Sequence, residues 1–194
     1  VEVTAAVVTL SDDPDLTELK QLNAATTGAI KINTQGKTYS GSTADLAAAL
    51  AGTVTNNAGA ALSGAMTVSD NASTAVAATD LSTIGGATTG TVTVTNAVAI
   101  SGTAAEVKAA LVTTTSKVEV TAATVTISDN AGTSIAATDL SAIGSETSGT
   151  VTVTNAINVT GTADEAIAAL HTTASKVEVT AAVVTLSDDP DLTE

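Results

Sequence analysis

Few side chains of this sequence have the chemistry to carry out a reaction. His171 is the only histidine, and the sequence contains no cysteine, so a thiolate nucleophile and a Cys/His zinc site are excluded. Asp164 and Glu165 are adjacent carboxylates, but they open a segment with helical spacing, where acids complement the helix dipole. No nucleophile elbow, phosphate loop or dinucleotide fingerprint is present. We therefore expect no enzyme, and assign no catalytic, cofactor-binding or metal-binding residue.

Clusters of aspartate suggest calcium binding as an alternative to catalysis, because Ca²⁺ prefers oxygen ligands. The motif SDDPD occurs twice, with its acids at Asp12, Asp13, Asp15 and at Asp188, Asp189, Asp191. The middle of the chain has only Asp-Asn pairs at the corresponding turns. Asp and Asn at turns also bond their own backbone without a metal. Calcium stays a candidate cofactor at the two SDDPD turns alone.

Rows of threonine suggest a second kind of surface. Alternating Thr side chains would face outward along two matching strands, at Thr91, Thr93, Thr95 and at Thr150, Thr152, Thr154. Flat arrays of this kind resemble ice-binding surfaces. Lys31, Asn33 and Glu119 interrupt the array in neighbouring segments, and Thr is also a common exposed strand residue. Ice binding is therefore a lesser alternative.

These residues sit in an internal repeat. The serine of an S-D-[DN] turn recurs at Ser11, Ser69, Ser128 and Ser187, with spacings of 58, 59 and 59 residues. The units are approximately 1–58, 59–117 and 118–176, and 177–194 begins a further unit. Residues 1–18 and 177–194 are identical, whereas the copies between them differ. The sequence thus has a higher-order period of 176 residues.

Each unit divides into two halves in which Val and Thr alternate, pass a polar corner and alternate again. Alternation indicates strands with one buried face. The inward set is predicted at Val151, Val153, Asn155, Ile157 and Val159 in one half, and at Val118, Val120, Ala122 and then Ala123, Val125, Ile127 in the other. Asn96 and Asn155, at matched corners, are placed to bond backbone groups of the bend.

Short helical segments follow the strands. Thr103 with Glu106, and Thr162 with Glu165, form capping boxes, and 42–50 is the equivalent segment of the first unit. The T-[DE]-L segment 138–143 predicts a single helical turn closed by Gly144. We expect Leu170 to face inward from the last of these helices.

A half-unit is too short to enclose a core, but stacked half-units bury one between them. We therefore predict a β-solenoid-like repeat with short helices, in which each unit of about 59 residues makes two coils of parallel strands and residues 1–194 form a single solenoid. A string of immunoglobulin-like sandwiches is disfavoured, since the units are too short and the core Trp is missing.

The composition limits the kinds of partner that the chain can bind. Twenty acidic residues against six lysines give a net charge of −14, which argues against nucleic acid. No apolar run is long enough for a membrane span. The sequence begins Val-Glu-Val, without an initiator Met or a signal peptide, as a segment of a longer chain would.

The motifs T-[DE]-L-x-x-I, T-G-T-V-T-V-T and T-A-x-E…A-A-L together resemble the repeats of very large bacterial surface proteins, including cyanobacterial ones. The resemblance covers essentially the whole chain and implies an extracellular structural or adhesive role at the cell surface. We expect a non-catalytic rod or filament that associates end to end. The alternatives are an adhesin stalk that binds a glycan or surface ligand and, less favoured by the irregular spacings, a designed consensus repeat.

Overall fold

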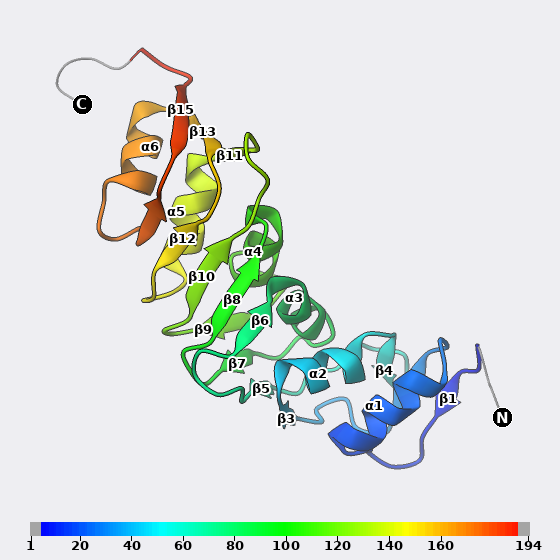
Figure 1. Ribbon diagram of the computed structural model, residues 1–194. Helices are drawn as coiled ribbons and strands as arrows, with labels where there is room; N and C mark the ends of the chain where they lie inside the picture. The colour runs from blue at the N-terminus through cyan, green and yellow to red at the C-terminus, as the bar shows by residue number, and fades with distance from the viewer. Residues whose placement is uncertain (1–4, 190–194) are drawn as a thin grey trace.

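The computed structural model describes residues 5–189, which contain six helices and fifteen short strands. The elements follow one another in chain order through the molecule, so that β1 and β15 lie at opposite ends (Figure 1). The helices are α1 (Leu16–Ala25), α2 (Thr43–Leu50), α3 (Ala78–Gly86), α4 (Ala104–Leu111), α5 (Ala137–Ser145) and α6 (Ala163–Leu170).

The strands form four separate parallel sheets. The sheets have the orders β1-β2-β4, β3-β5-β7-β9, β14-β12-β10-β8-β6 and β11-β13-β15. The strands are β1 (Val8–Thr9), β2 (Ile30–Ile32), β3 (Tyr39–Gly41), β4 (Val54–Asn56), β5 (Met66–Val68), β6 (Ala75–Ala77), β7 (Val92–Val94), β8 (Ala99–Gly102), β9 (Val118–Val120), β10 (Thr124–Ile127), β11 (Ser134–Ala136), β12 (Val151–Val153), β13 (Ile157–Gly161), β14 (Val177–Val179) and β15 (Ala182–Leu186).

Pairing joins positions about half a unit apart. Val125 of β10 lies opposite Val151 of β12, which lies opposite Val177 of β14. Each helix packs against the helices before and after it in the chain. A parallel pair needs a crossover connection, and the short helices supply it.

Local signals explain where the helices begin. Both predicted capping boxes are present: Thr103 and Thr162 accept the N–H of Glu106 and Glu165, whose carboxylates return to the N-cap N–H groups. At the start of α2, the side chain of Ser42 accepts the N–H of Asp45, which is one of the two bonds of such a box. The expectation of a single turn at 138–143 is wrong, because α5 spans nine residues and continues past Gly144.

The core is formed by small apolar side chains. Val151, Val153, Ile157 and Val159 are buried as predicted, and so are Val118, Ala123, Val125 and Ile127. Val120 and Leu170 are only half-buried, at the edge of the core. Ala122 and Asn155 are exposed, contrary to the prediction, because both lie in corners where the alternation is interrupted. The corner asparagines do bond backbone groups, but not those of their own bend: Asn96 and Asn155 donate to the carbonyls of Asp70 and Asp129, 26 residues earlier in the chain.

The predicted β-solenoid is wrong. The described residues form an α/β structure of four separate parallel sheets and six helices, with no sheet that closes or coils around the molecule. A regular coil would pair each strand with its own equivalent in the next layer. Instead β10, which follows a corner, pairs with β12, which precedes one. The alternating pattern predicted the strands but not that a strand after a corner pairs with a strand before one. It also predicted shorter helices than the structure contains.

Within the part of the chain that the structure describes, no helix combines the length and the apolar character that a bilayer crossing requires.

Candidate functional site

In three of the four S-D turns, the aspartate binds the start of a helix that lies about 25 residues earlier in the chain. The carboxylates of Asp70, Asp129 and Asp188 accept the first backbone N–H of α2, α4 and α6, at 2.7, 2.6 and 2.9 Å. The local caps leave this N–H free, and the positive end of the helix dipole favours a carboxylate there. Each of these turns therefore closes the N-terminus of a helix in the preceding layer.

Sequence reasoning missed this role. It explained the turn aspartates by bonds to their own backbone, which needs no distant partner. The available signal was the constant spacing between each turn and the preceding capping motif, since Asp129 and Asp188 each follow the N-cap Thr by 26 residues. Only the pairing of the strands shows that this separation returns the turn to the same helix.

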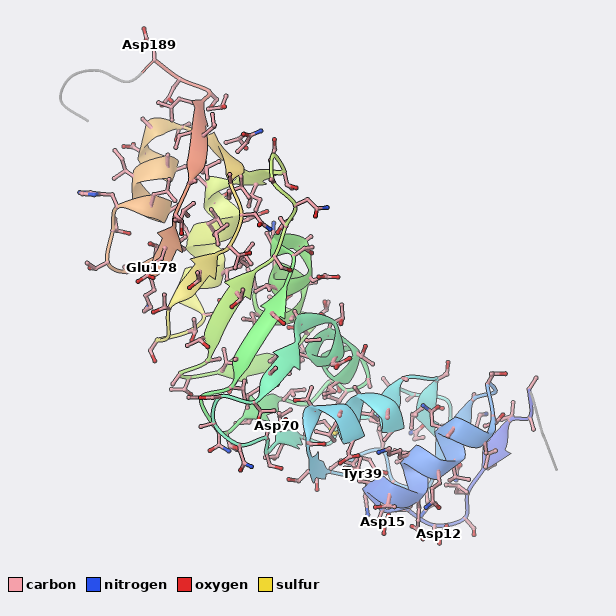
Figure 2. All side chains as sticks on the ribbon, in the orientation of Figure 1. Asp12, Asp15, Tyr39, Asp70, Glu178 and Asp189 are labelled. Carbon is pink, nitrogen blue, oxygen red and sulfur yellow. The ribbon has the colours of Figure 1, made fainter. Side chains whose placement is uncertain are left out.

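The first SDDPD turn uses two of its three acids in the fold. Asp15 is the N-cap of α1 in a capping box with Glu18. Asp13 accepts the backbone N–H of Thr34 at 2.7 Å, and hydrogen bonding from Thr34 lowers the pKa of the Asp13 carboxyl. Asp12 is exposed and has no hydrogen-bond partner among the described residues. Figure 2 shows Asp12 and Asp15 at the N-terminal end of the molecule.

This arrangement provides no set of ligands for a calcium ion. Within residues 5–189, no three Asp, Glu, His or Cys side chains gather where they could hold a metal ion. In the second SDDPD turn, Asp188 is engaged by α6, Asp189 is exposed at the opposite end of the molecule (Figure 2), and Asp191 lies outside the described residues. The calcium hypothesis remains a prediction without structural support.

The residues considered for catalysis lie at the two ends of α6, not in an enclosed site of the described structure. His171 is the exposed C-cap residue of α6, and its backbone N–H donates to the carbonyl of Ile167. Asp164 is exposed on the first turn of α6, and Glu165 completes its capping box. These positions match the helix-end roles expected from the sequence.

The first threonine row, Thr91, Thr93 and Thr95, is exposed as predicted, and so is Thr154, but the second row is less regular than expected. Thr150 and Thr152, expected to face outward, are half-buried. Thr152 lies between Thr126 and Glu178 of the neighbouring strands, so a carboxylate interrupts the row. Thr95 and Thr154 donate to the carbonyls of Val68 and Ile127, which uses their hydroxyls inside the fold.

A hollow lies at each end of the described part of the molecule. We call the first the α6 face: it is a hollow over α6 and β15, lined by Ala163, Ala166, Ile167, Leu170, His171, Val184 and Leu186. Ile167, Val184 and Leu186 are 38, 43 and 37 % exposed. Large apolar side chains that gather at one surface indicate an interaction site.

The second surface, the α1 face, is at the other end. It is a hollow between the first strand and α1, lined by Leu10, Asp12, Pro14, Glu18, Gln21 and Leu22. Apolar and acidic groups are mixed here, and Leu22 is only half-buried. The sequence analysis expected end-to-end association, but it did not identify these residues.

Comparison of the chain with protein families, with curated proteins and with solved structures finds no match. The function is therefore inferred from the surfaces and contacts described above.

Proposed function

We propose that this chain is a non-catalytic structural repeat of a bacterial extracellular surface protein, whose units continue end to end as a rod or filament. The observation that carries the proposal is the identity of residues 1–18 and 177–194, whose described parts, 5–18 and 177–189, lie at opposite ends of the molecule. A head-to-tail contact, in which one end of a copy binds the opposite end of the next, repeats without closing and produces a filament.

Contacts between layers support the proposal. The turn aspartates cap helices of the preceding layer, so each layer is completed by the next. Parallel strand pairing supplies a second connection of the same kind. The extracellular setting rests on the resemblance to large surface proteins and on the acidic, cysteine-free composition.

Electron microscopy and sedimentation velocity of the purified chain test this function. We expect the weight-average sedimentation coefficient to rise with concentration, and unbranched rods of uniform width to form in concentrated samples. A species that stays monomeric at all concentrations, with no rods, contradicts the proposal.

A further inference from the structure

The α6 face has a counterpart inside the molecule that is covered. The equivalent surface of α4 packs against α5, where Val107 is 0 % and Leu111 is 5 % exposed. There Lys108 reaches across the junction, with its Nζ 2.5 Å from Oδ1 of Asp139. In α6 the position of Lys108 is occupied by Ile167. The exposed face has thus replaced a charged contact with an apolar one.

The α1 face is the complementary half of such a junction. The T-E-L triplet of α1 aligns with the T-D-L triplet of α5, which places Leu22 at the position of Ile143. Ile143 is fully buried, whereas Leu22 is half-buried beside an open hollow. α1 therefore has an apolar residue at the position where α5 makes its core contact. In α5 that side is covered by α4, whereas no helix of the described chain covers the same side of α1.

The two faces share one strand sequence. Because residues 1–18 repeat at 177–194, Leu10 and Leu186 hold the same position, and each lines the hollow at its own end. One copy of the segment lies beside α6 and pairs with β13, and the other leads into α1 and pairs with β2. In the repeat register, residues 177–186 stand to α6 as 118–127 stand to α4, and α1 follows its copy of this segment as α5 follows 118–127.

From this we infer that β1 and α1 of a second copy of the chain take the place of β15 on β13, so that α1 of the second copy packs on α6 of the first. The inference rests on the proposed function and names its contact. One strand then pairs with β13 of one copy and with β2 of the other. The exchanged strands are identical, so the gain comes from covering Leu170 and Leu22. Their counterparts Leu111 and Ile143 are 5 % and 0 % exposed where α4 packs on α5, while Ile167 comes to face Glu18.

Asp12 is compatible with this exchange. Its equivalent, Asp188, accepts the N–H of Ala163 at the start of α6, while Asp12 itself is exposed and has no hydrogen-bond partner among the described residues. In the exchanged assembly, Asp12 of the second copy takes over the contact with Ala163. Asp188 gives up the contact that Asp12 takes over, so α6 stays capped in the assembly.

Cross-linking between two differently labelled copies tests the pairing. The chain has no cysteine, so Ile167→Cys in one copy and Gln21→Cys in the other provide the only thiols. A short bismaleimide should link the two in the mixture and neither variant with itself, because the contact is head to tail. Ala168→Cys, at the exposed neighbouring position of α6, replaces Ile167→Cys in the control. Equal yields from the two pairs, or self-linking of Ile167→Cys, would overturn the inference.

Sedimentation velocity separates this contact from filament formation in general. Ile167→Asp places a charge in the α6 face and opposite Glu18, and should abolish the rise of sedimentation coefficient with concentration. Ala168→Asp should assemble like the parent chain, and circular dichroism should give both variants similar melting temperatures, since both side chains are exposed. Rods that persist in Ile167→Asp overturn the docking proposed here and leave the proposed function intact. No association in any chain contradicts both.

Discussion

Tyr39 offers a direct optical measurement of one buried site. It is the only tyrosine of a chain that has no tryptophan, and 4 % of it is exposed. Its hydroxyl donates to the carbonyl of Pro14 at 3.3 Å. Burial, together with the negative charges of Asp13 and Asp15, raises the pKa of Tyr39 to about 12 from the ordinary 10.0. The fold therefore favours the protonated phenol.

Titration of the native chain at the tyrosinate absorption band should show this shift. We expect a midpoint near 12 in the folded protein and near 10 in denaturant. Because the folded pKa is the higher one, the stabilisation is complete below pH 10 and is lost as the pH rises through the folded pKa. A native midpoint equal to the denatured one contradicts the buried position.

Thr147 carries a buried hydroxyl that joins two layers. Its Oγ1 donates to the carbonyl of Ala123 and accepts the N–H of Gly149. Thr147→Val keeps the shape but leaves both groups unpaired, and should cost roughly 1–3 kcal/mol in the free energy of unfolding. Thr93→Val, at an exposed strand position whose hydroxyl makes no hydrogen bond within the described chain, is the control and should change stability little. Urea unfolding measures both, and similar losses would refute the role of Thr147.

At the scale of elements, two adjacent glycines at the end of α3 differ in their surroundings. A methyl group on Gly85 would overlap the carbonyl of Ser116, where the next layer passes the helix, whereas nothing lies near such a group on Gly86. Gly144 of α5 has the same relation to Ser175. Lack of a side chain at these positions lets successive layers approach closely.

Alanine substitution at each glycine should separate packing from helix propensity. Gly85→Ala should destabilise the protein by about 1–3 kcal/mol, because the backbone of the next layer must move. Gly86→Ala adds a methyl in open space and should gain up to about 1 kcal/mol. Thermal unfolding by circular dichroism compares the two variants. Equal effects would mean that the layers are not in close contact at Gly85.

Sequence reasoning predicted elements best where the signal is local. The capping boxes at Thr103 and Thr162 depend on residues three apart, and the structure confirms both. Burial of Val151 and Val153 follows from alternation alone. The shift from β10 to β12 was not predictable in this way, since it depends on which strands meet across half a unit. The replacement of Lys108 by Ile167 is visible when the repeats are aligned. Its effect on packing could not be predicted for the same reason, because it depends on α5 lying beside α4.

At the scale of the whole molecule, the layers depend on their neighbours. Strands pair about half a unit apart and helices pack on adjacent helices, so a local defect should spread only to nearby layers. Val153 lies at the centre of one layer and is 1 % exposed. Val153→Asp would bury an unpaired charge there, which costs several kcal/mol.

Hydrogen exchange followed by mass spectrometry should locate the damage from Val153→Asp. We expect protection to be lost across β10, β12 and β14, which contain or pair with the altered strand, while β2 and β4 near the other end keep theirs. Ala156→Asp, at an exposed corner position three residues away, is the matched control and should retain protection throughout. Uniform loss of protection in Val153→Asp would instead show that the chain unfolds as a single cooperative unit. Full retention would mean that residue 153 does not face the core.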